Sequence, residues 1–449
     1  MKRLFGTDGV RGIANQELTC ELAFNLGRAG AYVLTKVHKK PKIIIGKDTR
    51  LSCDMLESSL AAGLSSVGAD VYLVGVTTTP AIAYLTREKG FDAGVMISAS
   101  HNPYEFNGIK FFNSDGFKLS DATEMEIEDI ILNNRFDVIP KPENNMIGKI
   151  QTIDLKEDYK RFLKSTVDGL NLVGTKIVLD CANGASYKIA PEIFRELGAD
   201  VVVLSDNPNG ININKNCGST HLEHLQEEVL KHQADFGIAF DGDADRCLAV
   251  DENGEVVDGD KIMLLIANNL KKQGKLSSDT LVVTVMSNLG LFVAAKELDI
   301  NLEVTKVGDR YVLEKMLDGN FVVGGEQSGH IILLSHTTTG DGILTSLHLA
   351  KLIKESGQKL SELSKIMKVF PQVLKNAKVS NERKNDYIND IKIKNFISDL
   401  ENKYSGKGRV LIRPSGTEPL VRVMIEGENL EEITNDASNL ALLIEERLS

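Results

Sequence analysis

Three aspartates alternate directly after a short apolar run and form a dense group of potential metal ligands. They are Asp241, Asp243 and Asp245 in the segment DGDADR, which follows FGIAF. Three carboxylates this close repel one another unless a cation lies among them. Carboxylate oxygens are hard ligands that favour Mg²⁺, Ca²⁺ or Mn²⁺. The pattern therefore predicts a divalent metal site at the end of a buried strand.

Two other interpretations of this segment have to be weighed. An EF-hand is one of them, because Glu252 falls at position 12 of such a loop. Position 6 is Arg246, where that loop needs glycine. The residues that follow, CLAVDENGEVVDGD, are typical of a hairpin that turns at Asn253-Gly254, not of a helix. A solvated acidic turn without metal is the simpler alternative, and this segment alone leaves it open.

A second segment, ISASHNP, offers a nucleophile. It places Ser98 and Ser100 directly after the apolar run Val95–Ile97, with His101 next in the chain. A serine there can be acylated, be phosphorylated or cap a turn. The sequence has no G-x-S-x-G elbow that would support acyl transfer. A phosphoserine is close to a dianion, and a divalent cation would neutralise it. Phosphorylation therefore explains more than acylation does.

Two further polar loops follow expected strands. GGEQSGH, residues 324–330, carries Glu326 and Ser328, which can bind sugar hydroxyls. RPSGTEP, residues 413–419, combines Arg413 with two hydroxyls and the Gly416 amide, a set that suits a phosphate group. Either string is also a common glycine or proline turn. Ligands bind outside the carboxyl ends of the strands in open parallel sheets, so four such loops together favour a functional interpretation.

The elements that must position these loops follow a repeated plan of strand, helix and strand. The expected strands are short and rich in valine and isoleucine, as in a parallel sheet buried on both faces. Gly68 and Gly198 suit the left-handed position that follows a helix. Chance likeness of generic βαβ segments is the alternative to a true repeat. The three stretches cover residues 41–75, 175–206 and 279–308, with helices expected at 55–67, 185–197 and 289–298.

The C-terminal part of the chain differs from this plan. GRVLIRPSGTEPLVRVMIEG predicts two strands around the arginine loop, and the following residues predict a helix. Val421, Val423 and Ile425 share one face of the second strand. We interpret the lysine-rich stretch from Ser380 to Asn395 as a linker or mobile lead-in. The fold class is thus α/β, with three similar mixed or parallel-sheet domains and a smaller α+β domain. Four domains are predicted, each with one of the polar loops. They are 1–152 with the serine loop ISASHNP, 153–254 with the metal loop DGDADR, 255–368 with the sugar loop GGEQSGH, and 369–449 with the phosphate loop RPSGTEP.

Composition limits the classes of partner. The chain has 449 residues and a formal charge of -11, which argues against nucleic acid as the main partner. No apolar run approaches the length of a membrane span, so we expect no membrane association. The five scattered cysteines have no C-x-x-C pair and indicate reduced thiols in a cytoplasmic protein. A local group of arginines can still attract an anionic substrate.

The four loops together resemble the α-D-phosphohexomutase superfamily, nearly end to end and in the same loop order. The segments that carry the resemblance are ISASHNP, DGDADR, GGEQSGH and RPSGTEP, while FGTDGVRG and Gln327 resemble its bacterial phosphoglucosamine mutase branch. The resemblance implies four domains around a central cleft. It also implies site residues: Ser100 as phosphoserine; Ser100, Asp241, Asp243 and Asp245 as Mg²⁺ ligands; Glu326, Ser328, Arg413, Ser415, Gly416, Thr417 and Arg422 as substrate ligands; and His101, Lys110, Arg11, Arg246 and His330 as candidates for charge stabilisation and proton transfer.

The resemblance further implies a reaction. Phosphorylated Ser100 would interconvert glucosamine 6-phosphate and glucosamine 1-phosphate through glucosamine 1,6-bisphosphate, in an isomerase that feeds UDP-N-acetylglucosamine and cell-wall precursor synthesis. The partner is then a small phosphosugar, and a homodimer stays open. Phosphomannomutase or phosphoglucomutase activity is the nearest alternative. A Mg²⁺-dependent phosphohydrolase with Asp241 as nucleophile would leave Ser100 without a role, and a sugar-phosphate sensor would not need a nucleophile beside a metal.

Overall fold

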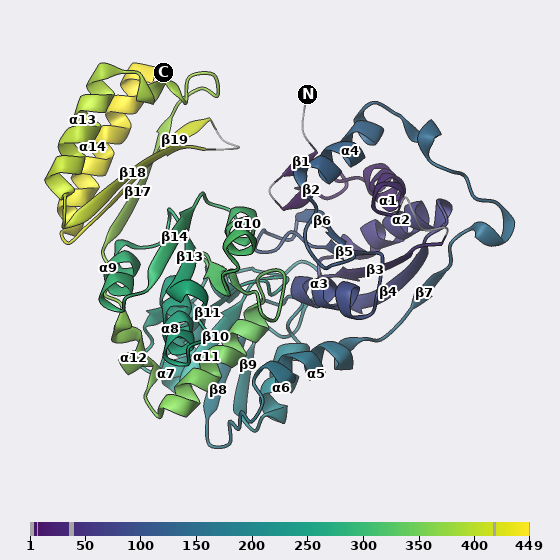
Figure 1. Ribbon diagram of the computed structural model, residues 1–449, viewed down its shortest axis with the longest axis horizontal. Helices are drawn as coiled ribbons and strands as arrows, with labels where there is room; N and C mark the ends of the chain where they lie inside the picture. The colour runs from purple at the N-terminus through teal and green to yellow at the C-terminus, as the bar shows by residue number, and fades with distance from the viewer. Residues whose placement is uncertain (1–3, 7, 36–39, 416–418, 449) are drawn as a thin grey trace. The chain divides into compact units, whose positions relative to one another are not determined.

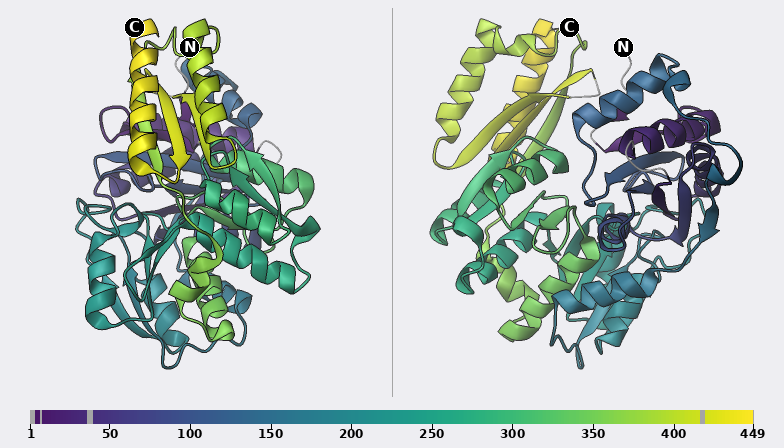
Figure 2. Two further views of the ribbon diagram at one scale, coloured as in Figure 1. Left: turned by 90° about the vertical axis from the view of Figure 1, so that its left-hand side faces the viewer. Right: turned by 45° about the vertical axis from the view of Figure 1, so that its right-hand side comes forward.

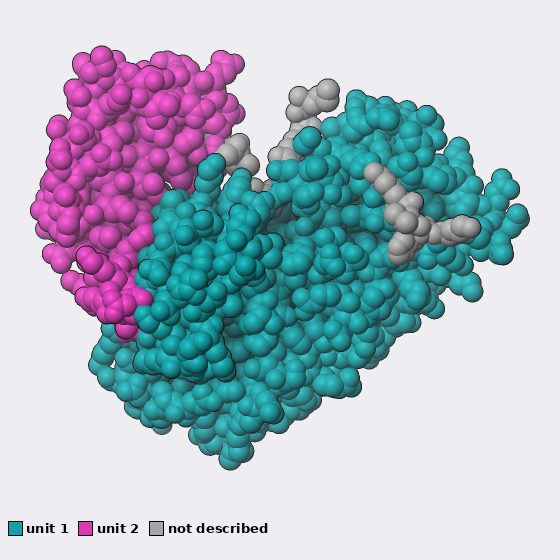
Figure 3. All heavy atoms as spheres, viewed as in Figure 1, with its two compact units in different colours: residues 1–286, 300–365 teal, residues 287–299, 366–449 magenta. Residues whose placement is uncertain are grey.

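The computed structural model describes residues 4–6, 8–35, 40–415 and 419–448. The chain forms two compact units, which Figure 3 distinguishes by colour: unit 1 contains residues 1–286 and 300–365, and unit 2 contains residues 287–299 and 366–449. Within the described ranges, none of the helices combines the length and the apolar character that a membrane span requires. All five cysteines are described, and each is a free thiol.

Unit 1 begins with a seven-stranded mixed sheet (Figure 1). Its strands are β1 (Phe5–Gly6), β2 (Gly9–Ile13), β3 (Lys42–Lys47), β4 (Asp70–Val76), β5 (Ala93–Ile97), β6 (Phe106–Asn113) and β7 (Ile150–Thr152), in the order β1-β2-β6-β5-β3-β4-β7. Successive side chains of a strand point to opposite faces, so Ile43 and Ile45 join one core cluster and Ile44 joins another. Helices α1 (Cys20–Leu34), α2 (Cys53–Ser66) and α4 (Asp121–Leu132) pack on the first face, and α3 (Thr79–Glu88) packs on the second.

Two smaller mixed sheets complete unit 1. One has the order β12-β11-β10-β8-β9 and the other the order β14-β13-β15-β16. Their strands are β8 (Lys176–Asp180), β9 (Asp200–Leu204), β10 (Phe236–Phe240), β11 (Cys247–Asp251), β12 (Val256–Val257), β13 (Thr280–Thr284), β14 (Asn301–Thr305), β15 (Val323–Gly325) and β16 (Ile331–Leu333). The helices of this part are α5 (Lys156–Thr166), α6 (Ile189–Glu196), α7 (Glu223–His232), α8 (Gly259–Lys272), α10 (Asp309–Gly319), α11 (Gly342–Ser356) and α12 (Leu360–Leu363).

The three predicted strand–helix–strand repeats are confirmed. The strand pairs β3–β4, β8–β9 and β13–β14 are parallel, and each pair is connected through a helix. Gly68 and Gly198 have φ angles of +97° and +94°, so both take the left-handed conformation predicted for them. The third connecting helix, α9 (Leu289–Glu297), belongs to unit 2 although its two flanking strands belong to unit 1.

Unit 2 contains a three-stranded antiparallel sheet in the order β17-β19-β18. The strands are β17 (Gln372–Lys378), β18 (Gly408–Pro414) and β19 (Leu420–Gly427), and the helices are α13 (Ile391–Tyr404) and α14 (Leu430–Leu448). Val421, Val423 and Ile425 are fully buried with residues of both helices, which cover one face of the sheet (Figures 1 and 2). The opposite face of β19 is also buried at Glu426, which accepts hydrogen bonds from Arg409 and from the backbone N–H of Leu289.

The linker predicted between Ser380 and Asn395 is partly wrong. Residues 386–388 form a 3-10 helix, and α13 begins at Ile391. Asp390 caps this helix, because its side chain accepts hydrogen bonds from the backbone N–H groups of Lys392 and Ile393. The many lysines and asparagines of the segment hid an amphipathic pattern in which Ile393 is the buried residue of the first turn.

The contact between α1 and α2 yields a test of the fold. A Cβ atom at Gly63 of α2 would lie 2.2 Å from the backbone oxygen of Phe24 in α1. We expect Gly63→Ala to destabilise the protein by about 1–3 kcal/mol through overpacking, although alanine is the better helix former. Thermal unfolding of the variant measures this effect. Ser58→Ala, on the exposed side of the same helix, is the control and should not lower the midpoint. An unchanged midpoint for Gly63→Ala would contradict the packing.

Candidate active site

The two serines after β5 have different partners. The Ser100 hydroxyl donates a hydrogen bond to Asp241 Oδ2 at 2.5 Å. The Ser98 hydroxyl instead donates to Asp48 Oδ2 at 2.7 Å and accepts from the Ser100 backbone N–H at 2.9 Å. Both side chains are buried. Ser98 therefore holds the loop in place, and Ser100 is the serine whose hydroxyl meets the acidic segment.

The three aspartates of that segment converge in the structure as the sequence predicts. Asp241, Asp243 and Asp245 are buried, and one carboxylate oxygen from each lies within 4.8 Å of the others. They occupy the turn between β10 and β11, which pair antiparallel. Strands on both sides, in place of the two helices of an EF-hand, exclude that interpretation. Burial likewise excludes the solvated acidic turn.

Hydrogen bonding in the triad leaves oxygens for a metal. Asp243 Oδ2 accepts from Lys110 Nζ at 2.8 Å and from the hydroxyl of Thr79, the first residue of α3. Asp243 Oδ1 and Asp245 Oδ1 are buried and have no hydrogen-bond partner among the described residues. Buried polar atoms are normally paired, and three hard oxygens so close together suit a divalent cation. The residues present therefore fit Mg²⁺.

The triad is electrostatically strained without a cation. Burial, together with the charges of Asp245 and Asp243, raises the pKa of Asp241 well above its usual range. Burial has the same effect on Asp245, but Lys110 and His330 outweigh it and hold the pKa of Asp245 well below its usual range. The three carboxylates are thus unequal, and Asp241, the partner of Ser100, is the one that most needs a positive neighbour.

Lys110 is the cation at the centre of these carboxylates. Its Nζ atom lies 2.8 Å from Asp243 Oδ2, 3.0 Å from Asp8 Oδ2 and 3.7 Å from Asp245 Oδ2. Burial alone would lower the pKa of Lys110, but the three carboxylates outweigh burial and raise it. Lys110 therefore keeps its proton. It can stabilise negative charge, and it is a poor candidate for a general base.

Arg11 and Arg246 add positive charge to the same site. Arg11 forms an ion pair with Asp8, and Arg246 Nε lies 3.8 Å from Asp245 Oδ1. The Nε atoms of both arginines are buried without a hydrogen-bond partner among the described residues. Guanidinium N–H groups left unpaired in this way suit the oxygens of a phosphoryl group.

His101 is a neutral ring under ordinary conditions. Its Nδ1 atom lies 3.4 Å from the Ser100 hydroxyl oxygen. Burial, with the nearby charges of Arg246 and Arg11, lowers the pKa of His101 to about 4. Its uncharged ring can accept or donate a hydrogen bond beside the serine without adding a charge.

His330 is held between two carboxylates. Its Nδ1 atom lies 3.6 Å from Asp245 Oδ2, and its Nε2 atom lies 3.6 Å from Asp309 Oδ2. Burial alone would lower the pKa of His330, but Asp245 and Asp309 outweigh it and raise the pKa. The Gly340 backbone N–H donates to Nε2 at 3.1 Å, an arrangement that requires the neutral ring with its proton on Nδ1. The carboxylates favour the charged form and this hydrogen bond favours the neutral form.

The predicted sugar loop is the turn between β15 and β16. Glu326 Oε1 accepts a hydrogen bond from the Gly308 backbone N–H at 3.0 Å, and Ser328 is exposed. Gln327 donates to Asp258, the residue that caps α8. One oxygen of Glu326 thus fixes the turn, while the exposed Ser328 hydroxyl can meet a ligand.

The predicted phosphate loop lies in unit 2. Arg413 on β18 and Arg422 on β19 are direct cross-strand partners. Burial and the charge of Arg422 lower the pKa of Arg413, because like charges directly opposite each other are unfavourable. Arg413 Nε is buried without a hydrogen-bond partner among the described residues. Ser415 is buried, whereas Gly416 and Thr417 lie outside the described residues. An anion bound by both arginines would relieve their repulsion.

Several residues around Ser100 and the triad have no signal in the sequence that singles them out. Thr79 binds Asp243, and Arg50 and Asn214 bind the Ser100 loop through backbone carbonyls. The segment TTTGDG, residues 337–342, also contacts the metal loop, residues 241–246. The Gly342 N–H donates a hydrogen bond to the Ala244 carbonyl at 2.9 Å. Residues 48–50 follow β3, but this position alone does not distinguish Arg50 from an ordinary turn residue.

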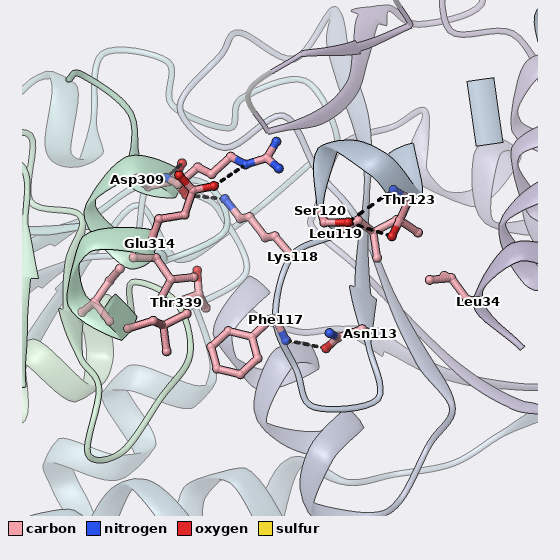
Figure 4. A pocket seen from close by; sticks show the side chains of 14 residues that line it. Leu34, Asn113, Phe117, Lys118, Leu119, Ser120, Thr123, Asp309, Glu314 and Thr339 are labelled. Atoms are coloured by element: carbon pink, nitrogen blue, oxygen red, sulfur yellow. Dashed lines mark hydrogen bonds and ion pairs between the residues drawn. The ribbon is translucent and has the colours of Figure 1, made fainter. Parts of the chain in front are cut away.

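A cavity of about 270 Å³ adjoins this network in unit 1 (Figure 4). Its lining includes the apolar side chains of Leu34 and Leu119 and four charged side chains, all of them in ion pairs: Lys118 with Asp309, and Arg310 with Glu314. Figure 4 shows Lys118 and Asp309 pointing toward each other. With its charges already paired, this cavity is poorly suited to bind a phosphate group.

Comparison with known proteins identifies the family. Models of the phosphoglucomutase/phosphomannomutase family match the chain as alpha/beta/alpha domain I at residues 2–138, domain II at 157–254, domain III at 258–370 and the C-terminal domain at 351–442. Among solved structures, a phosphoglucomutase/phosphomannomutase family protein from Burkholderia thailandensis is similar, with a TM-score of 0.79, 21% identity and coverage of 98% of both chains. An N-acetylphosphoglucosamine mutase from Aspergillus fumigatus, in complex with GlcNAc-6P and magnesium, has a TM-score of 0.70 and 18% identity, covering 100% of this chain and 96% of that one. These two structures show the shared fold.

The curated relatives are far more similar in sequence. A phosphoglucosamine mutase from Caldicellulosiruptor bescii is 71% identical over 449 residues, which is 100% of both chains. A phosphoglucosamine mutase from Acetivibrio thermocellus is 62% identical, again over 100% of both chains. The chain therefore belongs to the phosphoglucomutase/phosphomannomutase family and, within it, to the phosphoglucosamine mutases.

Proposed function

We propose that this chain interconverts glucosamine 6-phosphate and glucosamine 1-phosphate by way of a phosphorylated Ser100. The observation that carries the proposal is the hydrogen bond from the Ser100 hydroxyl to Asp241, 2.5 Å long, within a buried carboxylate triad that fits Mg²⁺. Relatives that are 71% and 62% identical over their full length bear the name phosphoglucosamine mutase. The substrate assignment follows from those relatives, and the chemistry follows from the site.

The reaction is a pair of phosphoryl transfers that balance. In the first, the bond from phosphorus to Ser100 Oγ breaks and a bond from phosphorus to the sugar O1 forms. The O1 proton passes to a base, and Ser100 Oγ takes up a proton as it leaves. The product of this step is glucosamine 1,6-bisphosphate. In the second, the bond from phosphorus to the sugar O6 breaks and a bond from phosphorus to Ser100 Oγ forms. The Ser100 hydroxyl gives up its proton, O6 takes up a proton, and glucosamine 1-phosphate is released. Phosphate is neither gained nor lost, which separates this reaction from that of a phosphohydrolase.

The residues of the site have distinct roles in this proposal. Asp241, Asp243 and Asp245, together with an oxygen of phosphorylated Ser100, would hold Mg²⁺. When bound, Mg²⁺ would neutralise negative charge on the phosphoryl group. Lys110, Arg11 and Arg246 stabilise the same charge from the protein side. His330 and His101 are the candidates for proton transfer, since Lys110 is held in its charged form.

Binding of the substrate rests on two further loops. Glu326 and Ser328 would bind the sugar, and a carboxylate suits the 2-ammonium group of glucosamine. Arg413, Ser415, Gly416, Thr417 and Arg422 would bind the phosphate group that is not being transferred. The opposed arginines favour this role, since an anion offsets their repulsion. Each loop would belong to its own domain, with the boundaries at residues 1–152, 153–254, 255–368 and 369–449. The free cysteines support the cytoplasm as the location, where the product would serve UDP-N-acetylglucosamine synthesis.

The first test separates the two serines. Ser100→Ala removes the proposed phosphoryl carrier, and we expect mutase activity to fall by at least about a thousandfold. Ser98→Ala removes only hydrogen bonds to Asp48 and to the Ser100 N–H, so its loss should be much smaller. Phosphopeptide mapping should find phosphate on Ser100 in the wild type and in Ser98→Ala. Phosphate found reproducibly on Ser98 alone would reverse the assignment.

The second test concerns the metal. Asp243→Asn removes one of the three clustered charges, so we expect Mg²⁺ affinity to fall, measured by titration calorimetry, and activity to need a higher Mg²⁺ concentration. Chelator should stop turnover of the wild type, and Mg²⁺ should restore it. Asp251→Asn is the matched control, because asparagine can keep the turn contacts that Asp251 makes with Asn253 and Glu255. Full activity of the wild type in metal-free buffer would refute the metal site.

The third test addresses specificity. Arg413→Ala should lower kcat/KM about 10- to 100-fold for glucosamine, glucose and mannose 6-phosphates alike, because a charge-assisted contact common to all three is lost. Glu326→Gln keeps an acceptor for the Gly308 N–H but removes the charge, so the preference for glucosamine phosphate should shrink. Lys378→Ala, at an exposed position of β17, is the control for Arg413. Kinetics with each sugar and its 1,6-bisphosphate measure both effects, and an unchanged ranking in Glu326→Gln would count against its role.

A further inference from the structure

The backbone of Ser100 is fixed on both sides in an unusual conformation. Its φ angle is +52°, in the left-handed region that non-glycine residues seldom adopt. On the amino side, the Ser100 N–H donates to Ser98 Oγ at 2.9 Å. On the carboxyl side, the Ser100 carbonyl accepts from Arg50 Nη2 at 2.8 Å and from Asn214 Nδ2 at 2.9 Å. Such strain at a functional residue persists only where the surroundings enforce it.

Arg50, which follows β3 of the same sheet, provides one part of this restraint on the Ser100 backbone. It is buried, its Nε donates to Asp48 Oδ2 at 2.8 Å, and its other N–H groups donate to the carbonyls of Ser100, Asn102, Pro103 and Phe106. Removing Arg50 would leave Asp48 as an uncompensated buried charge. Arg50 therefore contributes to folding, and the effect of an Arg50 variant would reflect the stability of the whole loop.

Asn214, in the loop after β9 of a different sheet, provides the other part of the restraint on the Ser100 backbone. Its side-chain amide donates both to the Ser100 carbonyl and to the Asn102 carbonyl, at 2.9 Å and 3.0 Å. The residue is itself left-handed, with a φ angle of +57°, and its N–H donates to the Ala182 carbonyl at 2.9 Å. Gly242 of the metal loop packs on the same spot, because a Cβ atom there would lie 2.5 Å from the Ser100 carbonyl oxygen and 2.9 Å from Asn214 Nδ2.

We propose that Asn214 is a positioning residue for phosphoryl transfer: it fixes the Ser100 carbonyl so that the Ser100 side chain is directed toward Asp241. The inference rests on the proposed function. With the N–H and the carbonyl both held, only the side chain remains to turn, and its hydroxyl meets Asp241. A phosphoryl group has to leave Ser100 and return to it in every turnover, and a misplacement of about 1 Å can cost about 100-fold in rate. Asn214 acts through the Ser100 backbone and contacts neither the three aspartates nor the sugar in this scheme.

Two variants test the proposal. Asn214→Gly removes the amide and tolerates the left-handed backbone, since glycine populates that region freely. Asn214→Asp keeps the shape of the side chain but replaces the N–H donors with an oxygen that repels both carbonyls. Asn216→Gly is the matched control, because Asn216 is exposed and has the same left-handed backbone in the same loop, with a φ angle of +52°.

The measurements separate positioning from folding. Steady-state kinetics use glucosamine 6-phosphate with glucosamine 1,6-bisphosphate, and phosphorus NMR records the phosphoserine resonance of each intact protein. We expect kcat to fall about tenfold or more in both Asn214 variants, with KM within about twofold of the wild type. We also expect a shifted or broadened phosphoserine resonance in both variants and wild-type behaviour in Asn216→Gly. If Asn214→Gly does not fold, Asn214→Asp decides.

Three outcomes would overturn the inference. One is a kcat within about twofold of the wild type in both Asn214 variants. Another is a lower kcat with an unchanged phosphoserine resonance, which would place the effect away from Ser100. The third is a loss in both Asn214 variants that matches a fall in the folded fraction. A wild-type protein without phosphate on Ser100 and without mutase activity would overturn the proposed function as well, whereas an active wild type with equally active variants would overturn the positioning role alone.

Discussion

The interaction on which the site in unit 1 depends is the burial of Lys110 among carboxylates from separate segments. Its Nζ atom lies within 3.7 Å of carboxylate oxygens of Asp8, Asp243 and Asp245. Charges this deeply buried are tolerated only when they are paired, and removing one partner leaves the others uncompensated. The contact therefore requires β6, the residues before β2 and the metal loop to pack together. Because β6 pairs with β5, the same requirement brings the Ser100 loop to the metal loop. The chemistry of the site and the packing of the seven-stranded sheet against the metal loop are thus parts of one constraint.

Much of this architecture could be predicted from the sequence because the signals for it are local. The runs Ile43–Ile45 and Val178–Leu179 are short, apolar and bounded by turn residues, so they predict buried strands. The predicted parallel pairs are the ones observed.

In the C-terminal part, the sequence predicted one face of a strand correctly and the other face incorrectly, and this difference has a physical cause. The alternation in β19 identified the face with Val423 correctly, but the other face contains Glu426, whose burial depends on Arg409 and on the amino end of α9. A charged residue in an alternating strand predicts exposure, and only the distant partner reverses that expectation.

The residues of the site likewise fall into those that the sequence identifies and those that it does not. Ser100 and the three aspartates could be found because each lies directly after an apolar run, where ligands bind in open sheets. Thr79, Arg50 and Asn214 could not, because their roles depend on contacts with residues between 50 and 164 positions away in the chain. Threonine at a helix start and asparagine in a glycine-rich loop are ordinary turn and cap residues. Nothing in their spacing distinguishes a side chain that binds its own loop from one that binds a loop of another sheet. The resemblance to a family supplied roles for the motif residues and none for these three.

The balance of charge explains why a phosphoserine and a divalent cation belong together here. Burial and the charges of Asp245 and Asp243 raise the pKa of Asp241, and the nearby charge of Arg246 does not offset them. A phosphoryl group on Ser100 would bring nearly two further negative charges to the partner of Asp241. Without a divalent cation the modified serine would face a carboxylate of the same sign at hydrogen-bonding distance. With the cation but without the phosphoryl group, the protein would offer the metal only the carboxylate oxygens of the three aspartates. The cation offsets the charge of the phosphoryl group beside Asp241, and the phosphoryl group supplies the metal with a further oxygen. We therefore expect loss of the phosphoryl group to weaken Mg²⁺ binding, and loss of Mg²⁺ to destabilise phosphorylated Ser100.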